Sequence, residues 1–329
     1  MAYLLRTPIQ HLKAEDHRFW GVFFGIASAF AYTTSNVCLR ELSTRCDPIW
    51  VSLMKAFPIF LLSGIAVISR AKRGKQTFRS FGWMLPVIAI SIFMQLGGNV
   101  TFQWSLGQIG LAITIPLTFG VILLSGALLG PLYLEEELHS RSIFAMTVLI
   151  GAIIILSIAA HQNPPGPSSN LPDLPPFYLA MAILAASIAG FAYGSSNALL
   201  RHYVKQGYCL STILCLMSGT GLLCLGTITL TQNGLAILMT TNFTDYLIML
   251  VAGVFNAIAF FTLAKSLQLL PILQANLVGV SQVAMGSLAG VLLFCETLSW
   301  LLVTGILLTA VGVVMIKGIP HGQQADGPS

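Results

Sequence analysis

The sequence predicts an all-α membrane protein with ten transmembrane helices, arranged as two five-helix repeats in inverted orientation. Three observations predict this fold class: the chain is poor in charge, long apolar segments recur along it, and one segment of the first half returns in the second. Charged residues make up 8% of the chain, whereas a soluble domain carries about 25%. Hydrophobic residues make up 56%. A chain of this composition is suited to lipid rather than to water.

Long apolar segments define the expected helices. A helix needs about 20 apolar residues to cross a hydrocarbon core of ~30 Å. Runs such as VLIGAIIILSIAA lack the alternation of barrel strands, and a helix satisfies its backbone hydrogen bonds within the segment. We therefore expect transmembrane helices at residues 19–39, 49–69, 83–103, 108–129, 142–160, 177–199, 210–230, 244–264, 272–294 and 299–316.

The basic residues predict the orientation, because cytoplasmic loops of membrane proteins are enriched in Lys and Arg. The segment RAKRGK at residues 70–75 is the strongest signal. With this segment inside, both termini are cytoplasmic, whereas Arg40 and Arg45 lie outside. The basic residues are spread between apolar stretches and form no face that follows phosphates, so the net charge of +5 does not indicate nucleic-acid binding.

An internal repeat relates the two halves. Residues 30–40 read FAYTTSNVCLR and residues 191–201 read FAYGSSNALLR. Each unit holds five expected helices, an odd number, so the second unit enters the membrane from the opposite side. Inverted repeats are typical of alternating-access carriers, which bind their substrate where the halves meet. The expected organisation is a first repeat at 19–160, an extracytoplasmic linker at 161–176, a second repeat at 177–316 and a cytoplasmic tail at 317–329.

A family resemblance follows from the end of each repeat. A small-residue-rich helix runs into an acidic position, in GALLGPLYLEEELHSRS and in MGSLAGVLLFCETLSW, and a Gly-rich helix follows, in VLIGAIIIL and in GILLTAVGVVMI. With its two five-helix units, the chain resembles the drug/metabolite transporter superfamily, and within it the ten-helix EamA-type carriers, over residues 19–316. The resemblance implies a plasma-membrane carrier of small solutes, and it leaves the substrate open because members carry chemically different solutes.

One departure from the superfamily concerns the first helix. The small four-helix multidrug members that the chain resembles keep a membrane-embedded Glu there. This chain instead carries a polar run with no acid, from Tyr32 to Asn36. A proton or cation exchange mechanism of that type is therefore not implied.

Lys55 is the sharpest candidate for a binding residue. It lies about 9 Å inside the outer boundary of the second expected helix at 1.5 Å per residue, and ionisable side chains inside the membrane are functional candidates by default. One interpretation is a ligand for a carboxylate or another anion in a central cavity. The alternative is a lysine that snorkels to the outer interface. The sequence shows no acid in the membrane interior to pair with it.

The repeated segment supplies a second set of candidates. Tyr32 and Asn36 lie four residues apart on one helix face, and Tyr193 and Asn197 repeat the arrangement in the second half. These side chains are either matched gates or substrate contacts, with Arg40 and Arg201 at opposite mouths. Alternatively, the Asn residues cap helix ends and the Arg residues anchor at the interfaces.

Side-chain amides gather in the third, eighth and ninth expected helices. Buried amides need partners, so they either line a wet cavity or bond across helices. Gln282 belongs to this group as well. The candidate substrate-binding residues are Lys55, Tyr32, Asn36, Gln95, Asn99, Gln103, Tyr193, Asn197, Asn256, Lys265, Gln274 and Asn276.

The remaining polar residues indicate no catalytic chemistry. The chain has no phosphate loop of the form GxxxxGK[ST], and we expect no cofactor, no bound metal and no enzymatic activity. The six cysteines form no CxxC pair and suit helix packing. The GxxxG pairs Gly126/Gly130 and Gly286/Gly290 favour close helix contacts. Glu296, like the acidic run at 135–137, lies at a helix end and is expected to be solvated.

These observations together predict a secondary transporter that moves a small polar metabolite, neutral or anionic, by alternating access. The alternative is a non-transporting membrane sensor or scaffold on the same fold. The expected partners are a small-molecule solute, the lipid bilayer and a second copy of the chain in a homodimer, with no nucleic acid.

Overall fold

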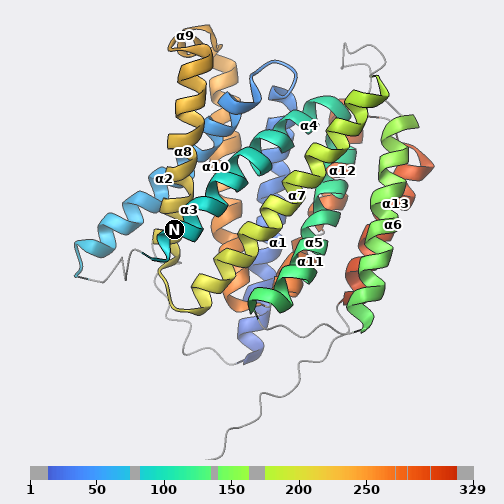
Figure 1. Cartoon of the computed structure of the whole chain (residues 1–329), viewed down its shortest axis with the longest axis horizontal. Coiled ribbons are helices and arrows are strands. Elements are labelled where there is room, and N and C mark those ends of the chain that lie inside the picture. The colour runs from blue at the N-terminus through green and yellow to red at the C-terminus, as the bar shows by residue number, and fades with distance from the viewer. Residues whose placement is uncertain are drawn as a thin grey trace, which may run out of the picture.

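The computed structural model describes residues 14–74, 82–134, 140–162, 175–270, 272–279, 281–296 and 298–316, and within these ranges the regular elements are helices. In Figure 1, α1, α5, α6, α8 and α10 run nearly parallel to one another, and α2, α7 and the segment from α3 to α4 are tilted across them. In chain order they are α1 (Ala14–Leu42), α2 (Pro48–Ala71), α3 (Met84–Phe93), the π-helix η2 (Met94–Val100), α4 (Thr101–Ile109), α5 (Leu111–Leu134), α6 (Ser140–Gln162), α7 (Pro176–Lys205), α8 (Leu210–Asn233), α9 (Ala236–Thr240), α10 (Phe243–Leu269), α11 (Ile272–Gly279), α12 (Ser281–Phe294) and α13 (Trp300–Ile316).

Seven helices in the described part of the chain are long and apolar enough to cross a membrane. The helices α12 and α13 contain shorter apolar stretches. The seven candidate spans are Phe19–Leu42, Pro48–Ala71, Met84–Ile109, Leu111–Leu132, Pro176–Lys205, Leu210–Asn233 and Phe243–Leu269.

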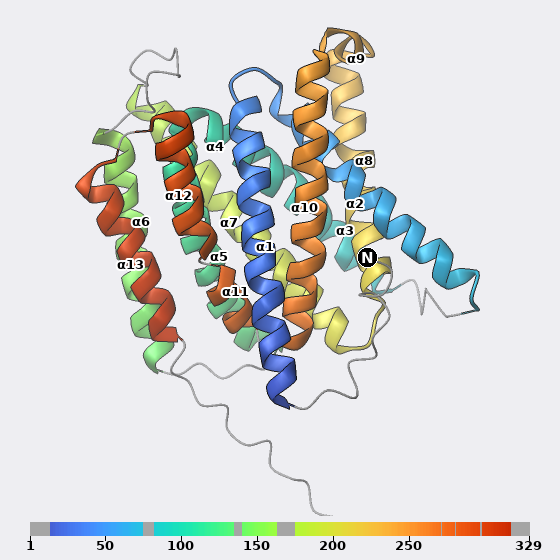
Figure 2. The ribbon, with the colours of Figure 1, turned by 180° about the vertical axis from the view of Figure 1, so that it is seen from behind.

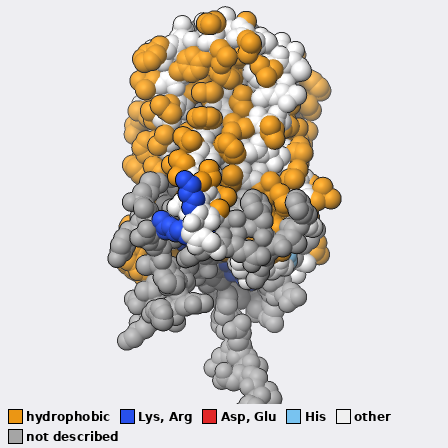
Figure 3. All heavy atoms as spheres, turned by 90° about the vertical axis from the view of Figure 1, so that its left-hand side faces the viewer, with side chains coloured by type: hydrophobic (Ala, Val, Ile, Leu, Met, Phe, Trp, Pro, Cys, Tyr) orange, Lys and Arg blue, Asp and Glu red, His pale blue; other side chains and the backbone are white. Residues whose placement is uncertain are grey.

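The outer surface has the character of a lipid-facing surface. Large hydrophobic side chains are exposed along α2, among them Leu61, Ile65 and Ile68. Figure 3 shows hydrophobic side chains over most of the coloured part of one face, with Lys and Arg side chains at the lower border of that part. Lys72 and Arg73 are exposed just beyond the end of α2. Soluble monomers rarely expose an apolar surface this continuous, so the protein is an integral membrane protein.

Local signals in the sequence set the turns between the first helices. Asp47 caps α2, because its Oδ1 accepts hydrogen bonds from the main-chain N–H groups of Ile49 and Trp50 at 2.9 and 3.0 Å. Pro48 follows as the first helical residue, where its missing N–H costs nothing. Gly110 ends α4 with a φ of +78°. This conformation suits glycine and lets the chain turn directly into α5.

Extensive contacts between pairs of helices hold the assembly together. The helix α1 packs along α10, and α7 packs along the continuous segment formed by η2 and α4. The helix α5 packs against α7, whereas α11 and α12 pack against α1. The helices α2 and α8 pair at one edge of the molecule, and α6 and α13 pair at the other (Figures 1 and 2).

Two expected helices differ in detail from the structure. The third runs on to Ile109, and the seven residues Met94–Val100 inside it form a π-helix. The ninth is described as α11 and α12, on either side of residue 280. The predicted linker at 161–176 is described only at its two ends, and the predicted tail at 317–329 lies outside the described residues.

Candidate functional site

A cavity of about 120 Å³ lies at the centre of the helix assembly. Helices from both halves of the chain contribute to it, and its apolar walls include Phe102, Phe119 and Phe260. The polar residues that line it are Ser28, Tyr32, Asn36, Lys55, Gln95, Asn99, Thr118, Tyr193, Ser196, Asn197, Ser218, Asn256 and Gln282.

Lys55 is the centre of a hydrogen-bond network in this cavity. Its Nζ donates to Oδ1 of Asn99 at 2.6 Å, and the hydroxyl of Tyr193 donates to the same oxygen at 2.9 Å. Nδ2 of Asn99 in turn donates to Oε1 of Gln95 at 2.6 Å. Tyr193 belongs to the second half of the chain, so the network joins the two halves.

The π-helix η2 carries both amides of this network, Gln95 and Asn99. A π-turn widens the helical ladder and is frequent at functional sites. Glycines let the neighbouring helices approach: a Cβ at Gly98 would lie 3.0 Å from Cε1 of Tyr193, and a Cβ at Gly221 would lie 2.6 Å from Cδ of Gln95. The local sequence therefore brings α7 and α8 against the polar face of η2.

Lys55 does not snorkel to the interface. Its side chain is 5% exposed, lines the cavity and bonds to Asn99. The interpretation of Asn36 and Asn197 as helix caps is wrong as well, because α1 continues to Leu42 and α7 to Lys205. Both Asn residues line the cavity instead, as do their partners Tyr32 and Tyr193.

Several predicted site residues lie elsewhere. Gln103 is buried and its Nε2 donates to the main-chain oxygen of Leu39 at 2.9 Å. Gln95 and Asn99 thus share the cavity network, whereas Gln103 contacts the end of α1 and is not among the residues that line the cavity. Lys265 and Gln274 are partly buried outside the cavity lining, and the side chain of Asn276 lies outside what the structure describes.

Sequence reasoning did not select four hydroxyl residues that line the cavity, namely Ser28, Thr118, Ser196 and Ser218. Ser28, for example, donates to the main-chain oxygen of Ala259 at 2.9 Å. Ser and Thr occur throughout the helices of this chain. No signal in a single sequence therefore separates the cavity-lining hydroxyls from the others.

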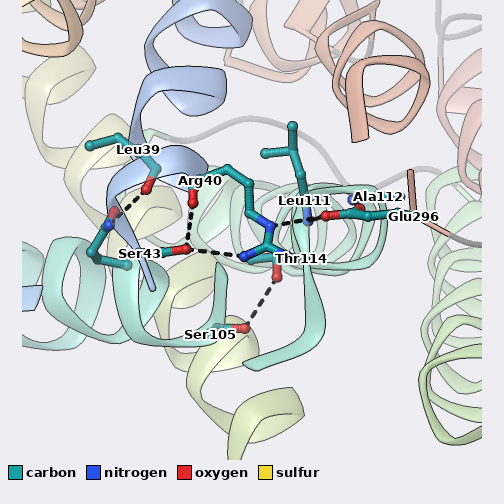
Figure 4. Close-up of polar contacts among 9 residues, drawn as sticks. Leu39, Arg40, Ser43, Ser105, Leu111, Ala112, Thr114 and Glu296 are labelled. Carbon is teal, nitrogen blue, oxygen red and sulfur yellow. Dashed lines mark hydrogen bonds and ion pairs between the residues drawn. The ribbon is translucent and has the colours of Figure 1, made fainter. Parts of the chain in front are cut away.

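A buried ion pair lies at the end of α1. Nε of Arg40 donates to Oε1 of Glu296 at 3.0 Å, and the two side chains are 3% and 5% exposed (Figure 4). The carboxylate also accepts from the main-chain N–H groups of Leu111 and Ala112 at 2.7 and 2.6 Å. The prediction that Glu296 is solvated is therefore wrong. The free N–H groups of the first turn of α5 and the guanidinium satisfy the buried carboxylate.

Two glycines provide the space for this carboxylate. A Cβ at Gly110 would lie 2.6 Å from Oε1 of Glu296, and a Cβ at Gly290 would lie 2.5 Å from Oε2. Gly290 also approaches the main-chain nitrogen of Ala112. The GxxxG pair Gly286/Gly290 thus serves a close helix contact, as the sequence predicts.

Arg201 occupies the equivalent position at the end of α7. It is buried, and its Nη1 donates to the main-chain oxygens of Leu267, at 2.8 Å, and of Leu270. These carbonyls lie at the end of α10, where the last turn of a helix leaves acceptors free. The arginine therefore satisfies the end of α10.

Comparisons with known proteins support the membrane character and the fold. No family model matches the chain. A protein of Dictyostelium discoideum described as "Transmembrane protein 234 homolog" is 26% identical over 73 residues, which are 22% of this chain and 57% of that relative's length. A solved structure described as "Crystal structure of protein" is 16% identical with a TM-score of 0.62, over 91% of this chain and 96% of that chain. The apolar helices and the transmembrane relative identify this chain as a multi-pass membrane protein.

Proposed function

We propose that this protein is a secondary transporter that moves a small polar metabolite across the membrane by alternating access. The observation that carries the proposal is the central cavity, to which the two halves contribute equivalent residues. Tyr32 and Asn36 line it from α1, and Tyr193 and Asn197 line it from α7. Carriers built from inverted repeats bind their substrate near the midplane, where the repeats meet.

The packing scheme supports a fold of the drug/metabolite transporter type, with ten crossings in two inverted repeats. The contacts of one half have counterparts in the other. The counterpart of the α1–α10 contact is the contact of α7 with η2 and α4. The counterpart of the α5–α7 contact is the contact of α11 and α12 with α1. In the pairs α2–α8 and α6–α13, each helix packs against its own counterpart from the other half. In this proposal α6, α13 and the pair α11–α12 add three crossings to the seven long apolar helices.

The proposed orientation has both termini in the cytoplasm of a cell with the protein in its plasma membrane. The start of α1 and the end of α13 lie toward the same, lower side of the molecule (Figure 1). The exposed residues Lys72 and Arg73 follow the lower end of α2. Cytoplasmic loops are the basic ones, which supports a cytoplasmic assignment of this side.

The chemistry of the cavity favours a carrier over an enzyme. The polar groups of its described lining are amides, hydroxyls and one lysine. Such groups bind a solute by hydrogen bonds.

Flux measurements with matched variants of α2 test the proposal. Ala56 lines the cavity, whereas Leu61 of the same helix is exposed on the outer surface. Metabolites that raise the melting temperature of the purified protein by binding are assayed for uptake into proteoliposomes. We expect uptake that Ala56→Phe abolishes by filling the cavity and that Leu61→Phe leaves intact. A ligand that binds without flux contradicts the proposal and favours a sensor, and a chemically converted ligand favours an enzyme.

A further inference from the structure

The hydrogen-bond network of the cavity leaves donors rather than acceptors for a ligand. A lysine ammonium carries three N–H donors, and an amide oxygen accepts two hydrogen bonds. Oδ1 of Asn99 receives both Lys55 and Tyr193, so its accepting capacity is used. Nδ2 of Asn99 is turned to Gln95. The further hydrogen-bonding capacity of Lys55, Asn99 and Gln95 lies mainly in N–H groups, which suit a ligand that presents acceptor oxygens.

The charge of the cavity points to an anion. Lys55 is the one charged residue in the described lining of the cavity, which includes no Asp or Glu. Its side chain is buried, and the partner that the structure shows for it is the neutral amide of Asn99. A buried charge without a counter-charge is costly. A ligand with one negative charge supplies the missing counter-charge and leaves the occupied cavity neutral.

The size and the apolar walls restrict the rest of the ligand. A cavity of about 120 Å³ is slightly smaller than the ~150 Å³ engineered cavity that holds benzene, and it is well below the ~300–1,000 Å³ of drug-sized pockets. Phe119 and Phe260 contribute aromatic surface to it. The space therefore suits one small ring or a short chain and is too small for a nucleotide.

We propose that the cavity binds a small organic monocarboxylate. Its carboxylate accepts from Nζ of Lys55 and from the amide N–H groups of Asn99 and Gln95, and its apolar body packs against Phe119 and Phe260. A phosphate monoester brings a second negative charge that the cavity does not balance, and a zwitterion brings an ammonium for which the described lining offers no carboxylate. The inference rests on the proposed function only in taking this ligand to be the transported solute.

A ligand series on the purified full-length protein tests the charge requirement. The probes are linear and aromatic monocarboxylates of two to eight carbons, each paired with its neutral amide, together with phenyl phosphate and phenylalanine. We expect at least one carboxylate to bind about tenfold or more tightly than its amide, because the ionic hydrogen bonds are lost in the amide. Equal binding of acid and amide, tighter binding of phenyl phosphate or phenylalanine, or no binding of any carboxylate overturns the proposal.

Variants of two lysines on α2 and at its end test the position of the carboxylate. Lys55→Met removes the charge from the cavity, whereas Lys72→Met removes one from the exposed end of the helix. We expect Lys55→Met to weaken carboxylate binding about tenfold or more while the amide is little affected, and Lys72→Met to leave both unchanged. Because Lys55→Met relieves a buried charge, the folded protein should persist, which its own melting curve checks. Unchanged carboxylate binding in Lys55→Met overturns the assignment.

The two proposals fail in different ways. Flux of a different class of solute, without carboxylate binding, retains the transporter and overturns the monocarboxylate site. Carboxylate binding that depends on Lys55 but is never followed by flux retains the site and overturns the transporter.

Discussion

Arg40 and Arg201 are the last residues of the two copies of the repeated segment, and the described contacts of Arg40 include a carboxylate, whereas those of Arg201 include main-chain carbonyls. Arg40 of the first half pairs with the carboxylate of Glu296 in the second half. Arg201 of the second half donates to the carbonyls of Leu267 and Leu270, at the end of α10 in its own half. In the described contacts, Arg40 thus joins the two halves, and Arg201 holds the end of a helix in its own half.

The contacts of Arg40 show how the two halves are joined at one end of the molecule. The Arg40–Glu296 pair connects α1 with the start of α5 and with the residues that follow α12. A carrier that alternates between two states needs its ends to differ in each of them. The Arg40–Glu296 ion pair is therefore a direct ionic connection between the two halves in this conformation.

The largest expected effect is the loss of the buried pair at the Arg40 end. Glu296→Ala leaves a buried guanidinium and two N–H groups of α5 without their acceptor, so we expect the free energy of unfolding to fall by about 3–5 kcal/mol. Unfolding of the purified protein in detergent measures the change.

An exposed ion pair at the same end provides the control. Arg45 and Glu41 lie 2.9 Å apart with side chains 44% and 49% exposed. Glu41→Ala should cost about 0–1 kcal/mol. Equal losses in Glu296→Ala and Glu41→Ala would show that the buried pair is not the connection described above.

The hydrogen bonds of Arg201 are expected to stabilise the end of α10. Arg201→Met removes the charged donor from the carbonyls of Leu267 and Leu270. We expect the loss of these hydrogen bonds to lower the free energy of unfolding by about 1.5–3 kcal/mol. The same unfolding assay measures the change, and an unchanged stability would show that these contacts do not hold the end of α10.

The smallest expected effect concerns the glycine beside Glu296. A Cβ at Gly290 would lie 2.5 Å from Oε2 of Glu296 and 2.9 Å from the main-chain nitrogen of Ala112. Gly290→Ala should therefore cost about 1–3 kcal/mol through overpacking. Gly64→Ala is the matched control, since a Cβ there meets no atom within 4 Å, and it should be neutral or stabilise α2 by up to about 1 kcal/mol. Tolerance of both changes would indicate that this contact is loose.

Much of the cavity lining could be predicted from the sequence. The repeat identified Tyr32, Asn36 and their counterparts, because matched polar residues in the middle of apolar segments have few other uses. Lys55 was selected because a charge within a membrane segment requires a partner or a ligand. These signals are local to one helix, so a single sequence carries them.

The features that the sequence did not predict depend on distant contacts. Glu296 follows a helix end. The local sequence around such a glutamate is the same whether its side chain is solvated or bound to Arg40, which is 256 residues away. The π-helix at Met94–Val100 likewise has no periodic signature of its own. The placement of Gln103 also depends on a distant contact, because its amide donates to the main-chain oxygen of Leu39, 64 residues away.

The inverted relation of the halves is the central claim, and side-specific labelling tests it most directly. Thr44 and Lys205 are separated by the repeat offset and are both exposed, just beyond the end of α1 and at the end of α7. Each is changed to Cys in a chain whose six native cysteines are replaced by Ser, and sealed cells are treated with a membrane-impermeant maleimide. We predict that Thr44→Cys reacts from outside and that Lys205→Cys reacts only after permeabilisation. Reaction of both positions from the same side would contradict the inverted repeat.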